Sequence, residues 1–407
     1  MNTPHGGVAL AAFRLDDPEL VESGDPGGML RQVASSAAQV RTAVRASDET
    51  DLSALRPDRR PRAIVVAGAG GSVFAGETLA AICGPRSPMQ VIGVSGYQLP
   101  GWVGAADLVI AVSRSGETAE VLALAAEAAR RGCDLAAVAA PGSPLQQVAL
   151  AARGTFIPVT AGGEPAPARS MAWALTVPLL VMASRLEIAR IDAAAYESAA
   201  AAMEDISHQC RPSSESFVNP GKSLALDLVG TLPLIWGGSP LAGVAARRFA
   251  AQLAANAKYP SLAGVLPDAG HDQVATFDGP FAPAPEPDFP AAEDFGDDSF
   301  GELSADHVGA LTETPDDNPL LRLVLLADQA GEQSAVTRSR EAAVSLAAAR
   351  GIEVSEIAMD GTAPLVRLAG AVHLLDYASV YLGIACGIDP LAIAAIKDLR
   401  DLTEPPV

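Results

Sequence analysis

Positively charged side chains are scarce in this 407-residue sequence, which holds 28 Lys and Arg residues against 48 Asp and Glu residues. The formal net charge of −20 argues against nucleic acid as a partner, because such a binder needs Lys and Arg to displace phosphate counterions. The same charge repels an anionic ligand at long range. Any site for an anion therefore depends on local hydrogen-bond donors.

Cysteines and long apolar runs are also rare. The four cysteines lie far apart and form no CxxC pair, a pattern that favours reduced intracellular thiols over a disulfide framework or a zinc site. The N-terminus lacks a basic start followed by a long apolar stretch, and no run of about 18 uncharged apolar residues occurs. We therefore expect a cytoplasmic protein with neither a signal peptide nor a membrane span.

Aromatic residues make up only 4% of the chain, whereas 49% of it is apolar, so the cores are expected to consist of Ala, Val, Leu and Ile. The length allows two domains, since a single core stops growing near about 250–300 residues. Short β-rich runs alternate with helical stretches of about 10–15 residues, which indicates βαβ units and a parallel sheet. The sequence predicts an α/β fold.

This alternation occurs twice, on either side of a helical bridge over residues 168–202. The expected strands lie at 63–67, 90–94, 108–112, 135–139 and 156–159 in the first half, and at 232–236, 321–326 and 353–358 in the second, before helices at 365–385 and 390–402. Residues 1–27 are expected to form a flexible N-terminal arm. Residues 278–318 are an acidic insert, for which a disordered loop and a lid or partner-binding segment remain alternatives.

The first expected strand ends in Gly68-Ala69-Gly70-Gly71-Ser72 and leads directly into a helix. Glycine permits close backbone approach, and the N–H groups at a helix start attract anions. A dinucleotide fingerprint is the competing interpretation, but Val73 stands at its third glycine and no acidic residue ends the second strand. A nicotinamide cofactor is therefore not expected.

A second polar loop, Ser113-Arg114-Ser115-Gly116-Glu117-Thr118, follows the strand at 108–112 and precedes a helix. Three hydroxyls and a glycine at this turn can offer several donors to the oxygens of a phosphoryl group. No P-loop lysine is present, so nucleoside triphosphate chemistry is not implied. Helix capping by Ser115 or Thr118 explains the same residues, and the loop alone leaves both interpretations open.

These two loops, with the segment VSGYQLPGWV between them, resemble the sugar isomerase (SIS) family. The order of motifs is most similar to the bifunctional phosphoglucose/phosphomannose isomerases, which carry GxGGS and SxSGNT loops, a Pro-Arg motif, an NEN-Lys helix end, an NHNE-like segment and a terminal lysine helix. The resemblance covers about residues 60–402, apart from the acidic insert. It implies two SIS-type subdomains, over 28–190 and 191–407, each a parallel sheet flanked by helices in three layers.

The resemblance assigns the sugar to the first loop and its phosphate to the second. The residues concerned are Gly70, Gly71, Ser72, Ser113, Ser115 and Thr118. Glu117 replaces the family asparagine, and a carboxylate beside a phosphate is unfavourable unless it points away. The family uses no metal and no cofactor, and its shared site implies a homodimer.

Three further positions match family residues that act on the sugar ring. Arg169 takes the place of the arginine in the Pro-Arg motif, which would steady the charge of an enediolate or hold the catalytic water network. His271 matches the histidine that opens the ring and reaches the site across a dimer. Lys397 matches the terminal lysine near the ring oxygen. A surface arginine and an exposed helical lysine remain the alternatives for Arg169 and Lys397.

One position departs from the family pattern. The glutamate of the NEN-Lys segment, which moves the proton between C1 and C2, is replaced by Ala255. Loss of a general base costs about 10²–10⁴-fold in rate. Two functions stay open. The first is a metal-independent aldose–ketose isomerase, which converts glucose 6-phosphate or mannose 6-phosphate to fructose 6-phosphate through a cis-enediol. The second is a non-catalytic phosphosugar sensor or partner protein.

Overall fold

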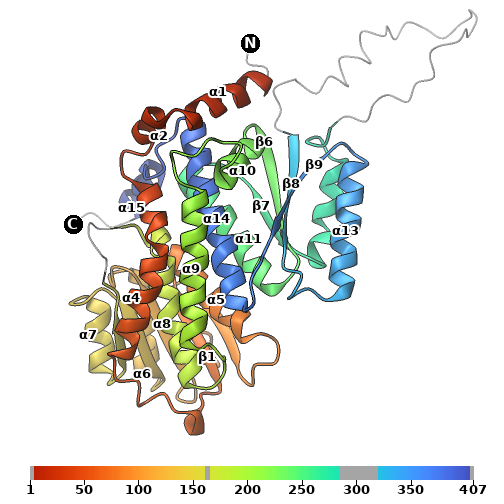
Figure 1. Ribbon diagram of the computed structural model, residues 1–407. Helices are drawn as coiled ribbons and strands as arrows, with labels where there is room; N and C mark the ends of the chain where they lie inside the picture. The colour runs from red at the N-terminus through yellow and green to blue at the C-terminus, as the bar shows by residue number, and fades with distance from the viewer. Residues whose placement is uncertain (1–3, 161–165, 284–319, 404–407) are drawn as a thin grey trace, which may run out of the picture.

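The computed structural model describes residues 4–160, 166–283 and 320–403, which form two lobes around separate parallel sheets (Figure 1). The strands are β1 (Ala63–Gly68), β2 (Gln90–Val94), β3 (Leu108–Ser113), β4 (Asp134–Ala139), β5 (Thr155–Pro158), β6 (Thr231–Gly237), β7 (Leu262–Val265), β8 (Leu320–Ala327) and β9 (Glu353–Ala358). The first sheet has the order β2-β1-β3-β4-β5 and the second β7-β6-β8-β9. The expected α/β fold with helix-flanked parallel sheets is confirmed.

Helices cover both sheets (Figure 1). They are α1 (Pro4–Asp16), α2 (Pro18–Gly24), α3 (Met29–Ala34), α4 (Ser36–Asp48), α5 (Val73–Cys83), α6 (Ala119–Arg130), α7 (Pro144–Ala151), α8 (Ala172–Arg185), α9 (Ala193–Gln209), α10 (Pro220–Leu228), α11 (Pro240–Gln252), α13 (Ser334–Ala348), α14 (Pro364–Ala385) and α15 (Ala394–Thr403). The expected boundary between residues 190 and 191 falls between α8 and α9. Residues 284–319, which hold most of the expected acidic insert, lie outside the described residues.

The central strands of both sheets are apolar runs with almost no exposed surface, because helices pack on both of their faces. β5 ends in Pro158 at the edge of its sheet, where a missing backbone N–H breaks no ladder. β7 was not expected from the sequence. It is a short, largely half-buried strand that pairs in parallel with β6 at the edge of the second sheet.

The two sheets share one topology, because β1 adjoins β3 and β6 adjoins β8, while β2 and β7 lie on the outer sides. The direction of the strand order therefore reverses between β1 and β3, and again between β6 and β8. In open α/β sheets, ligands bind outside the carboxyl ends of the strands at such a reversal. Each lobe thus has one edge where a ligand site is expected.

Helix α14 is strongly apolar and packs against α9, α10 and α11. By length and composition it could cross a membrane, but 89% of its most apolar stretch is buried inside the protein. It also carries the buried polar residues Arg367, His373 and Asp376. These features identify α14 as a core helix.

The N-terminal segment, expected to be a flexible arm, contains the helices α1 and α2, which pack beside α14 (Figure 1). Leu15 is fully buried, and Arg14 Nη1 donates a hydrogen bond of 2.9 Å to the carbonyl of Ala385. The Nζ of the buried Lys222 donates to the carbonyl of Leu15 at 2.5 Å. These contacts hold α1 to the body of the protein.

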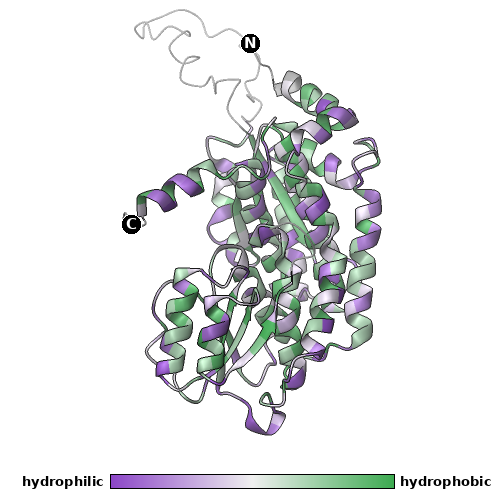
Figure 2. Ribbon diagram, turned by 90° about the vertical axis from the view of Figure 1, so that its left-hand side faces the viewer, coloured by the Kyte–Doolittle hydropathy of each residue, from purple (hydrophilic) through white to green (hydrophobic). Residues whose placement is uncertain are grey.

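Helix α15 differs from the others because all of its described residues are exposed. Figure 2 shows it standing away from the body of the molecule. Its exposed apolar side chains are Ile396, Leu399 and Leu402, and the preceding Ile393 is exposed as well. An amphipathic helix of this kind leaves an apolar stripe without a partner in the described part of the chain.

Candidate functional site

The loop after β1 begins with a tight turn, η2 (Gly70–Ser72), that leads into α5. Gly70 has a φ of +53°, in the left-handed region that favours glycine. Gly71 lies against the short turn η3 (Ala168–Ser170), and a Cβ at Gly71 would stand only 3.1 Å from the backbone nitrogen of Arg169. The glycine therefore lets the two turns touch.

The loop after β3 is closed by its own hydroxyls. The buried Ser113 Oγ lies 2.9 Å from Thr118 Oγ1 and accepts a hydrogen bond of 3.1 Å from the N–H of Gly116. Ser115 Oγ accepts from the N–H of Glu117 at 3.2 Å. Thr118 stands at the N-cap of α6, but its side chain makes no capping bond. Helix capping therefore does not account for Thr118.

Both loops meet at one edge of the first sheet, because Gly68 at the end of β1 pairs with Val112 near the end of β3. This edge is the point where the strand order reverses. The structure thus brings together the six residues expected to bind the sugar and its phosphate. They are Gly70, Gly71, Ser72, Ser113, Ser115 and Thr118.

Arg169 lies beside these loops and is half buried, so it is not a freely exposed surface arginine. Its Nε donates a hydrogen bond of 3.0 Å to Asn256 Oδ1, and its Nη2 donates one of 3.0 Å to the carbonyl of Pro390. Burial lowers the pKa of Arg169, and the charge of Asp389 opposes this shift. The guanidinium therefore joins the first lobe to the connection between α14 and α15.

Ala255 lies in a π-helical turn, η4 (Leu253–Ala257), at the end of α11. Lys258 follows with a φ of +55°, and its Nζ donates to the carbonyls of Ala255 at 3.0 Å, Asp389 at 3.0 Å and Pro390 at 3.4 Å. Burial lowers the pKa of Lys258, and the nearby Arg169 lowers it further. Sequence reasoning gave Lys258 no role, although it is the lysine of the NEN-Lys match.

A buried ion pair between Arg248 and Asp376 supports the backbone of Arg169. Arg248 on α11 donates to both carboxylate oxygens of Asp376 on α14, at 3.0 and 2.6 Å. Its Nη2 also donates to the backbone carbonyl of Arg169 at 3.0 Å. The guanidinium carbon lies 4.7 Å from the centre of the Phe74 ring on α5. Arg248 thus fixes η3 from the second lobe.

His271 and Lys397 are not brought to this edge within one chain. His271 is exposed just after β7 in the second lobe, and Lys397 is exposed on α15. In the described ranges, no hydrogen bond or ion pair joins either side chain to the two loops. Glu117 is also exposed. The catalytic roles expected for His271 and Lys397 therefore remain predictions.

The matching edge of the second lobe is filled by the protein itself. Ser239 follows β6, and its Oγ donates to Asp328 Oδ2 at 2.6 Å. Arg367 Nε donates to Asp328 Oδ1 at 2.7 Å, and all three residues are buried. A fixed carboxylate thus stands in the second lobe where the first lobe offers hydroxyl groups.

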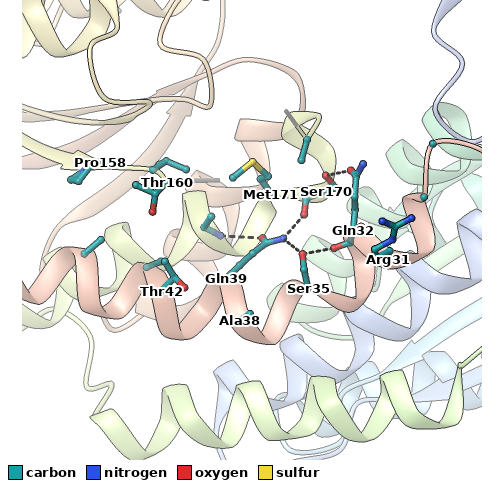
Figure 3. A pocket seen from close by; sticks show the side chains of 17 residues that line it. Arg31, Gln32, Ser35, Ala38, Gln39, Thr42, Pro158, Thr160, Ser170 and Met171 are labelled. Atoms are coloured by element: carbon teal, nitrogen blue, oxygen red, sulfur yellow. Dashed lines mark hydrogen bonds between the residues drawn. The ribbon is translucent and has the colours of Figure 1, made fainter. Parts of the chain in front are cut away.

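A cavity of about 590 Å³ lies on the other side of η3, between α4 and the end of β5 (Figure 3). Its amide and hydroxyl groups largely bind one another: Gln39 Nε2 donates to the carbonyl of Ser170 at 2.7 Å, and Ser170 Oγ donates to Gln32 Oε1 at 2.8 Å. The cavity does not include the two polar loops. Among the described residues of η3, Ser170 lines the cavity.

Two family models match the chain. The SIS domain matches residues 59–161, and the bacterial phospho-glucose isomerase C-terminal SIS domain matches residues 217–402. The first match contains β1 to β5 with both polar loops, and the second contains β6 to β9 with α14. The chain belongs to the SIS-domain proteins.

Within this family the chain is similar to curated bifunctional phosphoglucose/phosphomannose isomerases. The protein from Caldicellulosiruptor bescii is 25% identical over 340 residues, which cover 83% of this chain and 88% of the relative. The protein from Aquifex aeolicus is 23% identical over 341 residues, which cover 84% of this chain and 90% of the relative.

Solved structures share the fold. A hypothetical protein of Thermus thermophilus has a TM-score of 0.65 at 15% identity, covering 97% of this chain and 93% of that chain. The C-terminal domain of glucosamine-fructose-6-phosphate aminotransferase from Francisella tularensis has a TM-score of 0.58 at 15% identity, covering 89% of this chain and 97% of that chain. The two-lobed architecture thus occurs in chains with little sequence in common.

Proposed function

We propose that the chain binds a phosphorylated hexose at the edge formed by β1 and β3, and that it acts as an aldose–ketose isomerase. Its substrates would be glucose 6-phosphate or mannose 6-phosphate, with fructose 6-phosphate as product. The observation that carries the proposal is the meeting of two SIS-type loops with the half-buried Arg169 at one sheet edge. The relatives named above support an isomerase.

In this proposal the phosphate binds to Ser113, Ser115 and Thr118, whose hydroxyls now bond within the loop and can turn toward phosphate oxygens. Arg169 stabilises the negative charge of a cis-enediolate near Gly71. The reaction needs no metal and no cofactor, because proton transfers suffice. The protein would work in the cytoplasm.

The ring-opening residues would come from a second copy of the chain. His271 and Lys397 are exposed and unattached to their own loops in the described structure, as residues that serve a partner site would be. The apolar stripe of α15 offers a surface for such a homodimer. A dimer would thus complete the site.

Ala255 favours a second candidate function, a phosphosugar-binding protein without turnover. An alanine methyl group in η4 cannot accept the proton that must move between C1 and C2. The loops and Arg169 serve binding equally well in both functions. The two candidates therefore differ only in the proton transfer.

The test is isomerase turnover of the purified protein with mannose 6-phosphate and glucose 6-phosphate, alongside calorimetric binding. Turnover in the parent that is lost in His271→Ala would support a working isomerase with another base. A silent parent that binds phosphosugar, and that gains turnover with Ala255→Glu, would support the binding function. If the parent neither binds nor converts these sugars, both candidates are wrong.

A further inference from the structure

We propose that Gln39 on α4 is a positioning residue, which fixes η3 and with it the backbone of Arg169 at the edge where the phosphosugar binds. The inference rests on the proposed function and adds a residue to its site. The two family models match residues 59–161 and 217–402, so neither Gln39 nor η3 lies in a matched range. The role of Gln39 follows from its contacts in the structure.

The start of α8, directly after η3, lacks a local cap. Met171 stands at the N-cap, and its side chain makes no hydrogen bond to the first N–H groups of the helix. Ser170 and Ala174 are four residues apart, which is the spacing of a helical hydrogen bond, but no direct bond joins their backbones in the described part of the chain. The first such bond runs from the N–H of Leu175 to the carbonyl of Met171, at 3.2 Å. The Ser170 carbonyl and the Ala174 N–H therefore need another partner.

The side-chain amide of Gln39 supplies this partner (Figure 3). Its Nε2 donates a hydrogen bond of 2.7 Å to the carbonyl of Ser170, and its Oε1 accepts one of 3.4 Å from the N–H of Ala174. The amide thus bridges the two groups as a peptide unit would. Nε2 also donates to Ser35 Oγ at 3.1 Å, so both amide hydrogens of Gln39 are bonded and the amide is fixed against rotation.

Consecutive carbonyls of η3 are therefore held by side chains from two different elements. Arg248 on α11 donates to the carbonyl of Arg169 at 3.0 Å, and Gln39 on α4 donates to that of Ser170. The hydroxyl of Ser170 adds a bond of 2.8 Å to Gln32 Oε1 on α3. A single 3-10 turn has too few internal hydrogen bonds to fix its own position. The place of η3 depends on these bonds from outside.

Loss of the Gln39 bond would let η3 take positions in which Arg169 does not meet the sugar. The apparent Kd then rises by the inverse of the fraction of molecules that keep the competent position. The loss of one net hydrogen bond changes such an equilibrium by about fivefold. In the described residues Gln39 makes no hydrogen bond to the loop after β3, where the phosphate is proposed to bind. The effect should therefore concern the sugar and leave the phosphate unaffected.

The test measures the binding of glucose 6-phosphate and of inorganic phosphate to the full chain by isothermal titration calorimetry, in two variants. Gln39→Met removes both bonds of the amide. Gln39→Glu keeps an acceptor for the Ala174 N–H, at a helix start that favours a carboxylate, but at neutral pH it cannot donate to the Ser170 carbonyl. Both variants should bind glucose 6-phosphate about fivefold more weakly and phosphate unchanged. In urea unfolding, Gln39→Met should lose stability and Gln39→Glu should retain it.

Thr42→Glu is the matched control, because Thr42 is exposed on α4, lines the same cavity and makes no hydrogen bond to η3 in the described residues. It adds the same charge and should bind both ligands like the parent. The inference is wrong if Gln39→Met binds glucose 6-phosphate as tightly as the parent, if both ligands weaken equally, or if Thr42→Glu matches Gln39→Glu.

Hydrogen exchange over residues 168–175 tests the support of η3 without a ligand. The amides of this segment should exchange faster in Gln39→Met than in the parent, because the bridge between Ser170 and Ala174 is lost. Unchanged exchange would overturn the inference. If the parent binds neither ligand, the proposed function fails, whereas faster exchange in the variant would still show that Gln39 fixes η3.

Discussion

The Arg248–Asp376 ion pair lies at the lobe interface, and we expect Asp376→Ala to destabilise the protein strongly. Arg248 is 7% exposed and Asp376 3%, and the two hydrogen bonds between them measure 3.0 and 2.6 Å. The alanine variant leaves a guanidinium buried between α11, α14 and the Phe74 ring without its carboxylate. Breaking a buried pair in this way costs about 3–5 kcal/mol.

The assay is urea unfolding followed by circular dichroism, with the free energy of unfolding compared between parent and variant. A double variant, Arg248→Met with Asp376→Leu, should recover part of the loss, because two apolar side chains need no counter-charge, while Gln252 Nε2 and the Arg169 carbonyl lose their partners. Asp58→Ala is the matched control, since Asp58 pairs with Arg56 at an exposed surface. It should leave the unfolding transition unchanged.

The reasoning would be refuted if Asp376→Ala cost no more than the exposed control, or if the double variant were as unstable as the single one. A second consequence concerns the site. Arg248 Nη2 holds the carbonyl of Arg169 at 3.0 Å, so Asp376→Ala should also weaken phosphosugar binding in calorimetry. Loss of stability with unchanged affinity would show that η3 needs no support from the second lobe.

Three further outcomes are expected. Gly71→Ala should weaken phosphosugar binding in calorimetry, because its Cβ would stand 3.1 Å from the backbone nitrogen of Arg169. Burial lowers the pKa of His373 from 6.5 to about 3. Between these pH values the imidazole is therefore protonated in the unfolded chain and neutral in the folded chain. Stability should therefore fall as the pH drops from 6.5 toward 3, and His373→Leu should flatten this slope in unfolding experiments. Lys222→Met removes the ammonium that binds three backbone carbonyls, one of them on α1, so limited proteolysis should cut the N-terminal helices sooner.

Much of the fold follows from local sequence. β1 and β3 are continuous apolar runs that end in glycine or serine, so their bounds and the loops after them could be predicted within about two residues. β7 could not, because four residues at a sheet edge carry no strong apolar period. Helix α1 lies within residues 1–27, a segment rich in Gly, Asp and Pro, which suggested a flexible arm. Its burial depends on tertiary contacts with α14.

The candidate site divides in the same way. The glycine and hydroxyl loops have short-range signals, so they could be found from the sequence. The bonds from Arg169 to Asn256 and Pro390 join residues 87 and 221 positions apart, and no local pattern reports such contacts. The π-helical turn before Lys258 could not be predicted from the sequence either, because its residues are typical of an ordinary Ala-rich helix end.

The buried Ser239–Asp328–Arg367 cluster makes the two halves of this molecule differ at equivalent places, because both oxygens of Asp328 already accept from Ser239 and Arg367. A phosphate that approached the second edge would find the charge of Arg367 already neutralised by Asp328 and the Ser239 hydroxyl already donating to the same carboxylate. The chain thus has one proposed binding site, in the first lobe, and the second lobe supports it as a rigid unit. Titration with phosphosugar should accordingly saturate at one equivalent per chain.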